Sequence, residues 1–449
     1  MLRTLKLIIA AALFFGIEHW LGDALGDEFQ RTAAGLALMA TIAWLWVTEA
    51  LHVSVTALLV PLLAALSGVL AFDEALLQFA DPVIFLFLGG FALAAGLQRQ
   101  GLDRWLAGLV MRQAGADFGR AVRWLFWLTA FLSMWISNTA TAAMMLPLAL
   151  GLLAPLKLDG DRRTAMYVLL GVAFSANIGG IGTLVGSPPN AIAAAQVGLS
   201  FAGWLLWGLP LVLVLMPLME AGLRWCLKPR LDFELVTPSA PAAWTGAQTQ
   251  MLALFGFTVL LWVFGGVLAD GLGLTRGYDA AVAVLALVLL HALRLASWQD
   301  IERNTEWGVL LLFGGGLTLS KALADSGAAA WLAAQLGGPL TQLPVLACIA
   351  LMVLFALLLT ELTSNTASAA LLIPLFLGMA PHVDSVPLAV LVAVGASCAF
   401  MLPVATPPNA IVFGTGQVPQ RVMIVAGLRV TVLIYPALIA AAAIALALY

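Results

Sequence analysis

The sequence predicts an all-α polytopic membrane protein. Of the 449 residues, 63% are hydrophobic and 10% are charged, and the mean hydropathy is +1.04. Charged residues make up about a quarter of a soluble domain. The apolar runs are continuous and about 20 residues long, as in membrane helices, whereas barrel strands would alternate apolar and polar positions. Because lipid offers the backbone no hydrogen bonds, these runs are expected to be helices.

Eleven apolar stretches have the length of a membrane-crossing helix. They lie at 5–22, 32–51, 53–72, 82–98, 164–182, 201–225, 250–269, 279–294, 307–324, 388–403 and 423–448. The first begins like a signal peptide. His19, Trp20 and Asp23 stand where a cleavage site would need small residues, so we interpret this stretch as a span.

Two further apolar stretches, 124–155 and 345–380, each carry a Ser-Asn-Thr triplet near the middle. A polar triplet there interrupts a helix, which predicts a hairpin that enters and leaves the membrane on the same side. With a cytoplasmic amino terminus, this arrangement places 16 of the 20 Lys and Arg residues inside, and only Arg31, Arg276 and Lys321 outside. Hairpin 124–155 then opens inward, hairpin 345–380 opens outward, and the carboxy terminus is periplasmic or extracellular. The expected location is a bacterial inner membrane.

The chain also contains a duplication. SNTATAAMMLP at 137–147 returns as SNTASAALLIP at 364–374, with seven of eleven positions identical and a separation of 227 residues (137 to 364). VGSPPNAI at 185–192 returns as VATPPNAI at 404–411, with six of eight identical. Gly-Gly pairs, which we interpret as close-packing points, stand at 89–90 and 314–315. Since the hairpins open to opposite sides, the repeat is expected to be inverted in topology.

These markers divide the chain into four parts. We expect an N-terminal span and loop at 1–31, a first repeat at 32–226, a polar linker at 227–249 and a second repeat at 250–449.

The four polar breaks carry the candidate chemistry. Paired prolines at 188–189 and 407–408 cannot continue a helix, so each break leaves unpaired carbonyls from one half-helix and unpaired amides from the next. Carbonyls and hydroxyls suit a small hard cation such as Na⁺, and amides at half-helix amino ends suit an anion.

Positive side chains are absent from both triplets and both proline breaks. Holding a dianion at membrane depth with neutral dipoles alone is unfavourable, and cations bound beside it would remove that difficulty. A single triplet would be more typical of close helix packing, but its duplication with matched flanks favours a site. Glu49 and Glu361 are intramembrane carboxylates that either serve function directly, cap a helix or orient a loop.

At these residues the chain resembles the divalent anion/sodium symporter (DASS) family of dicarboxylate, citrate and sulfate carriers. The resemblance is carried by the duplicated Ser-Asn-Thr, by TELTSNT at 360–366, by SPPNAI and TPPNAI, by Trp-x-Thr-Glu-Ala at 46–50 and by FLFLGGF at 85–91. It implies a homodimer whose protomers have scaffold and transport domains and work by an elevator movement.

The resemblance also implies site residues. The substrate would meet Asn138, Thr139, Ser187, Asn365, Thr366, Thr406 and Pro407. One Na⁺ site would consist of Ser133, Ser137, Asn138 and Gly186, and the other of Thr360, Ser364, Asn365 and Ala405.

The expected function is Na⁺-coupled symport of C4-dicarboxylates such as succinate, malate or fumarate. The alternatives are a sulfate or citrate symporter and a sodium-independent dicarboxylate exchanger. An ion channel would need a continuous pore, which hairpins opening to opposite sides do not favour. An enzyme is not expected, because the sequence has no HExxH motif and no Ser–His or paired-Asp constellation at membrane depth. The expected partners are a small dicarboxylate, the lipid bilayer and a second copy of the chain, with no nucleic acid.

Overall fold

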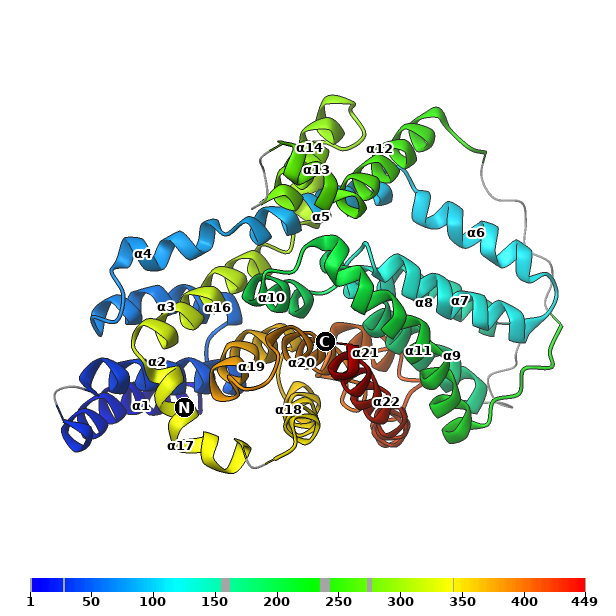
Figure 1. The fold of residues 1–449 in the computed structure, drawn as a ribbon. Helices are drawn as coiled ribbons and strands as arrows, with labels where there is room; N and C mark the ends of the chain where they lie inside the picture. Colours follow the sequence, from blue (N-terminus) through cyan, green and yellow to red (C-terminus); the bar gives the residue numbers. More distant parts are fainter. Residues whose placement is uncertain are drawn as a thin grey trace.

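The computed structural model describes residues 2–26, 29–154, 162–234, 243–272, 277–341 and 343–448. This part of the chain is helical, with an isolated bridge between Asp117 and Glu234 as its strand-like pairing, so the predicted all-α class is confirmed (Figure 1). Lys157, Arg276 and part of the predicted linker, 235–242, lie outside the described residues.

The elements follow one another as successive helices. The first half contains α1 (Leu2–Leu25), α2 (Gln30–Thr48), α3 (Val53–Leu66), α4 (Phe72–Leu77), η2 (Gln78–Ala80), α5 (Pro82–Arg99), α6 (Leu102–Ala114), α7 (Phe118–Ser133), α8 (Asn138–Leu153), α9 (Arg162–Gly179), η3 (Leu184–Gly186), α10 (Pro188–Val197) and α11 (Phe201–Leu227). The second half contains α12 (Gly246–Val263), α13 (Gly265–Leu272), α14 (Tyr278–Ala292), α15 (Trp298–Asn304), α16 (Trp307–Asp325), α17 (Ala328–Thr341), α18 (Val345–Thr360), α19 (Asn365–Met379), α20 (Ser385–Ser397), α21 (Pro407–Phe413) and α22 (Gln420–Leu448).

Seven segments of the described chain are long and apolar enough to cross a membrane. They are Arg3–Gly22, Gln30–Thr48, Phe72–Arg99, Phe201–Leu227, Gly246–Val263, Trp307–Asp325 and Gln420–Ala447. Shorter apolar helices of 10–17 residues, α8, α18 and α19 among them, form much of the remainder. The count of eleven crossings, the domain boundaries and the orientation of the termini stay predictions.

Helices end at the polar positions that the sequence singled out. α7 ends at Ser133 and α8 begins at Asn138, and α18 ends at Thr360 and α19 begins at Asn365. The residues before the paired prolines are extended, with φ of −148° at Ser187 and −142° at Thr406. This is the conformation that a following proline imposes, since its ring excludes the helical region for the preceding residue.

The helices form two groups. In the first, α1–α5 pack with α12–α16; in the second, α7–α11 pack with α18–α22 (Figure 1). α6 and α17 lie between the groups: α6 contacts α5 and α7, and α17 contacts α16 and α19. We call these the outer group and the hairpin group.

Within the outer group the two halves of the chain exchange partners. α5 packs on α14 and α16 packs on α3, so each glycine-rich helix lies against a helix of the other half. A Cβ at Gly89 would lie 2.5 Å from the Cβ of Ala283, and one at Gly315 would lie 2.7 Å from the Cα of Ala57. Only glycine allows this approach, which supports the interpretation of the Gly-Gly pairs as close-packing points.

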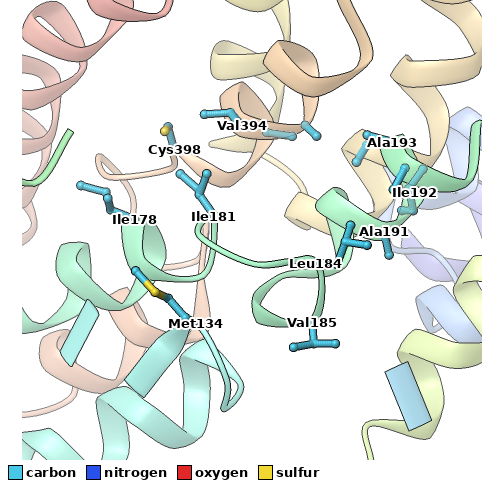
Figure 2. Packing of buried hydrophobic residues seen from close by; sticks show 14 of the residues in the cluster. Met134, Ile178, Ile181, Leu184, Val185, Ala191, Ile192, Ala193, Val394 and Cys398 are labelled. Carbon is cyan, nitrogen blue, oxygen red and sulfur yellow. The ribbon is translucent and has the colours of Figure 1, made fainter. Parts of the chain in front are cut away.

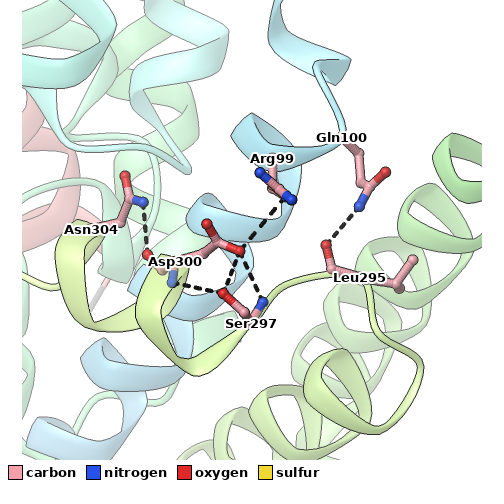
Figure 3. A network of polar contacts seen from close by, with 6 residues as sticks. All are labelled: Arg99, Gln100, Leu295, Ser297, Asp300 and Asn304. Atoms are coloured by element: carbon pink, nitrogen blue, oxygen red, sulfur yellow. Dashed lines mark hydrogen bonds and ion pairs between the residues drawn. The ribbon is translucent and has the colours of Figure 1, made fainter.

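A polar network at the end of α5 joins the halves further (Figure 3). The hydroxyl and backbone N–H of Ser297 donate to Asp300 at 2.7 and 2.9 Å, capping α15, and Arg99 lies 3.7 Å from the same carboxylate. The hydroxyl hydrogen bond, with the backbone one, holds the pKa of Asp300 below its usual range. Gln100 donates to the carbonyl of Leu295 at 2.7 Å. The turn after α14 is therefore fixed to the end of α5.

The break between α9 and α10 is embedded in apolar side chains (Figure 2). Ile178 and Ile181 are fully buried on one side of it, together with Val394 and Cys398 of the second half. Gly182 lies against Met134 of the first hairpin, since a Cβ there would be 2.9 Å from the methionine side chain. Close packing restricts the irregular backbone, so its carbonyls keep fixed positions.

Candidate binding site between the two helix groups

A cavity of about 530 Å³ lies where the outer group meets the hairpin group. Both triplets and both proline breaks reach it. The predicted residues that line it are Ser137, Asn138, Thr139, Gly186, Ser187, Ser364, Asn365, Thr366, Ala405, Thr406 and Pro407. Residues more than two hundred positions apart thus face one chamber, as the duplication suggests. Their roles in binding substrate or Na⁺ stay predictions.

Ser133, one of the two predicted residues outside the lining, lies directly behind it. Its hydroxyl oxygen is 2.6 Å from the carboxamide oxygen of Asn138 and 2.7 Å from the carbonyl oxygen of Ala176. A hydroxyl has one hydrogen to donate, and both neighbours are acceptors in this orientation of the carboxamide. The three oxygens therefore form a cluster with one donor too few.

The second half repeats this cluster around Thr360, the other predicted residue behind the lining. The Thr360 hydroxyl oxygen is 2.7 Å from the carboxamide oxygen of Asn365 and 2.6 Å from the carbonyl oxygen of Ala396. Three oxygens from three different segments converge in both halves. Hard cations such as Na⁺ prefer oxygen ligands of this kind, so the chemistry of the donors fits the predicted Na⁺ sites.

A second pair of asparagines supports the breaks from behind. The side-chain amide of Asn190 donates to the carbonyls of Gly180 and Thr183 at 2.8 and 2.7 Å. Asn409, its counterpart, donates to the carbonyls of Ala399 and Leu402 at 3.2 and 3.1 Å. Each amide satisfies two carbonyls that a broken helix would leave unpaired. An asparagine side-chain amide thus stabilises the irregular backbone of both breaks.

The second break has an additional support, Glu361. Its carboxylate accepts hydrogen bonds from the backbone N–H groups of Phe400, Met401 and Leu402 at 2.7–3.0 Å, and its side chain is buried. Of the three roles that the sequence left open for Glu361, orientation of a loop is the one the geometry shows. The first half has Met134 at the corresponding position, whose carbonyl accepts from the hydroxyl of Thr183.

Two polar residues of the described lining were not singled out in the sequence. Asn177 is fully buried in α9, and its amide donates to the Thr406 hydroxyl at 3.1 Å and to the Ala399 carbonyl at 3.2 Å. It joins the first half to the break of the second. The other is Glu306, which precedes α16 and lines the same cavity as Ser137. Neither residue belongs to a repeated motif, so the duplication in the sequence does not identify them.

The ionisable side chains in the described cavity wall are acidic. Among the described residues that line it there is no Lys, Arg or His, and the ionisable ones are Glu49 and Glu306. Glu49 ends α2 with φ of +48°, a left-handed conformation that non-glycine residues adopt at a cost of about 1 kcal/mol or more. A dianion entering this chamber meets no positive side chain from the described part of the chain. Bound cations would therefore be needed to balance it.

One prediction follows from the glycine beside the first oxygen cluster. A Cβ at Gly180 would collide with the carboxamide oxygen of Asn138 and lie 3.0 Å from the Gly186 carbonyl. We expect Gly180→Ala to lower the affinity for Na⁺ by about ten-fold or more, as overpacking costs of 1–3 kcal/mol imply. Sodium-dependent thermal stabilisation measures this. Gly256→Ala, where nothing lies within 4 Å of the added Cβ, is the matched control and should behave as wild type. Equal sodium dependence in both variants would refute the cluster's role.

Comparison with known proteins adds to this geometry. A family model described as citrate transporter (CitMHS) matches residues 43–395. An uncharacterized transporter of Haemophilus influenzae is 48% identical over 406 residues, covering 88% of each chain. The sodium-dependent dicarboxylate transporter SdcS of Staphylococcus saprophyticus is 33% identical over 439 residues, covering 89% of this chain and 83% of that protein. The crystal structure of the Alcanivorax borkumensis YdaH transporter superimposes with a TM-score of 0.56 at 14% identity, covering 82% of this chain and 86% of that one.

Proposed function

We propose that this chain, which belongs to the citrate transporter (CitMHS) family, is a Na⁺-coupled symporter of C4-dicarboxylates such as succinate, malate or fumarate. Family membership makes it a secondary transporter and an integral membrane protein rather than an enzyme. Its DASS-type motifs and its relatives agree on that class. The choice of ion and substrate is our proposal.

The observation that carries the proposal is the pair of oxygen clusters behind a chamber whose described lining has no positive side chain. Na⁺ at the two clusters would supply two positive charges beside a doubly negative substrate. The carboxylates would then meet Asn138, Thr139, Asn365 and Thr366 at the amino ends of α8 and α19. Helix amino ends attract anions through their free N–H groups. The name of SdcS supports this choice, since it describes a sodium-dependent dicarboxylate transporter.

Citrate is the second candidate substrate. The family model that matches this chain is described as a citrate transporter, and a cavity of about 530 Å³ is larger than a C4-dicarboxylate requires. The two oxygen clusters serve either anion equally well. The ligand screen below separates them.

For the mechanism, we propose an elevator movement within a homodimer in a bacterial plasma membrane, with the amino terminus cytoplasmic. The cavity lies between the outer group and the hairpin group, which α6 and α17 join. If the hairpin group carries the substrate past the outer group, these two connecting helices are the segments that must swing.

The test is a thermal-stability screen of the purified protein with succinate, citrate or sulfate, each in Na⁺ and in K⁺. We expect succinate to stabilise the protein in Na⁺ but not in K⁺. The expected gain in the free energy of unfolding is about 2.7 kcal/mol at a succinate concentration about 100 times the Kd. The physical reason is that the anion site forms only when cations balance its charge. Equal stabilisation in K⁺ would contradict sodium coupling, and stabilisation by citrate alone or by sulfate alone would contradict the dicarboxylate assignment.

A further inference from the structure

A second cavity, of about 590 Å³, lies where the carboxyl end of α11 meets the amino ends of α9 and α22. Four of its lining residues are positively charged: Arg163, Lys228, Arg421 and Arg429. Trp225, which is 55% exposed, forms part of the same wall. We call this the basic pocket. It is separate from the cavity between the helix groups and shares no residue with it.

The charges of the basic pocket are not compensated within the described part of the chain. No carboxylate lines it, and none of its four cations makes an ion pair with a described residue. The acid nearest along α11, Glu220, is engaged elsewhere, 2.6 Å from Arg224 and 3.6 Å from Arg123. Four like charges around one hollow repel each other, so the pocket favours an anionic ligand.

Arg429 is oriented rather than free. One of its guanidinium nitrogens donates to the backbone carbonyl of Trp225 at 3.2 Å, and its Cζ lies 5.1 Å from the centre of that indole ring. A guanidinium has five N–H donors in a fixed plane, so most of them remain for a ligand. Lys228 ends α11 in a left-handed conformation with φ of +46°. The Arg429 guanidinium is therefore held at the wall of the pocket by its contacts with Trp225.

The position of Arg429 along α22 indicates that the ligand is a component of the membrane. The residue lies within the span Gln420–Ala447, nine positions after the start of α22 and so roughly 13 Å along its axis. α22 has 29 residues, roughly 44 Å, and exceeds a hydrocarbon core of about 30 Å, so its first turns reach the headgroup region. An arginine near the inner edge of that region needs an anionic or polar partner. An exposed tryptophan beside it is typical of the membrane interface.

The face of α22 next to the basic pocket is apolar and exposed. Val425 lines the pocket and is 38% exposed, and Leu428 and Val432 follow at 49% and 54%. These positions continue from the pocket toward the middle of the span, at helical spacing. A ligand that fills the pocket can thus extend an apolar chain along the helix. A small soluble anion would gain nothing from this face.

We propose that the basic pocket binds the headgroup phosphate of an anionic phospholipid, whose acyl chain lies along Val425, Leu428 and Val432 of α22. The phosphate oxygens would accept hydrogen bonds from Arg421 and Arg429, and Arg163 and Lys228 would add attraction at the rim. The lipid binds to the hairpin group, because α9, α11 and α22 all belong to it. The inference is independent of the transported ion and substrate.

Native mass spectrometry of the full chain in detergent tests the proposal. The probes are phosphatidylglycerol, which is anionic, and phosphatidylcholine with the same acyl chains, which is neutral overall. We expect phosphatidylglycerol to bind more tightly, and the double variant R421Q/R429Q to lose about five-fold in affinity for each cation removed. R162Q is the matched control, since Arg162 is exposed, stands next to Arg163 and does not line the pocket. It should retain the affinity of wild type.

Other outcomes overturn the proposal. Equal binding of the two lipids, equal loss in R162Q, or full retention of phosphatidylglycerol by the double variant would each exclude a specific phosphate site. Displacement of the bound lipid by millimolar inorganic phosphate would reassign the pocket to a soluble anion. If the double variant fails to fold, R163Q/K228Q changes two exposed side chains at the rim and should show the same loss for phosphatidylglycerol.

Discussion

Replacing Asn138 or Asn365 by alanine is expected to abolish sodium-driven succinate uptake. Each carboxamide oxygen lies 2.6–2.7 Å from the hydroxyl of Ser133 or Thr360, at the boundary between cavity and oxygen cluster. Each substitution removes one oxygen from a proposed Na⁺ site and one polar group from the proposed substrate site. Losing hydrogen bonds to charged groups costs about 1.5–3 kcal/mol each, so we expect uptake to fall at least about 100-fold.

The measurement is initial uptake of labelled succinate into proteoliposomes with an inward Na⁺ gradient. Asn304→Ala is the control, because Asn304 lies in α15, outside the cavity, and donates to the Asp300 carbonyl at 2.8 Å. It should transport as wild type does. Size-exclusion profiles check that the variants fold. Normal uptake by both N138A and N365A would eliminate the proposed pocket.

The second large effect is expected for Glu361→Gln. The carboxylate accepts three backbone N–H groups of the second break, and its side chain is 4% exposed. A glutamine of the same shape has one acceptor oxygen and presents an NH₂ group to these donors. At least one buried N–H then loses its partner, which costs about 1–3 kcal/mol, and more because the lost acceptor was charged.

We expect E361Q to melt several degrees lower and to lose the stabilisation by Na⁺, because the loop that carries Ala405 and Thr406 is no longer held. Thermal unfolding in Na⁺ and in K⁺ measures both effects. Glu302→Gln changes an exposed carboxylate of α15 and should leave both unchanged. An E361Q variant as stable as wild type, with intact sodium response, would show that the carboxylate is dispensable.

The duplication predicted that the polar breaks of the two halves face each other, and their role in binding stays a prediction. Ser137 to Thr139 and Ser364 to Thr366 stand at matched positions in two polar interruptions of apolar helices, and the structure brings both to one cavity. Asn177 and Glu306 were not predicted, because each is a single polar residue with no counterpart in the other half. Their importance depends on which segments fold against them, which periodicity and spacing do not encode.

The fold was predictable to a similar depth. Long apolar stretches and polar breaks gave the main helices and their interruptions. The short helices α6 and α17 were not predicted, because neither has the length or the continuous apolar run of a span. The partners of the Gly-Gly pairs were not predictable either. A glycine indicates close approach, but Gly89 carries no information about whether the approaching backbone is that of α3 or of α14.

The exchange of partners between α5 and α14, and between α16 and α3, has a consequence for synthesis. When the ribosome has completed α11, Gly89 of α5 has no packing partner, because Ala283 has not yet been made. The nascent first half must remain inserted in the bilayer without these helix contacts until α14 and α16 are made. Folding of the two halves is therefore coupled. A truncated chain that ends before α14 lacks the helix on which α5 packs.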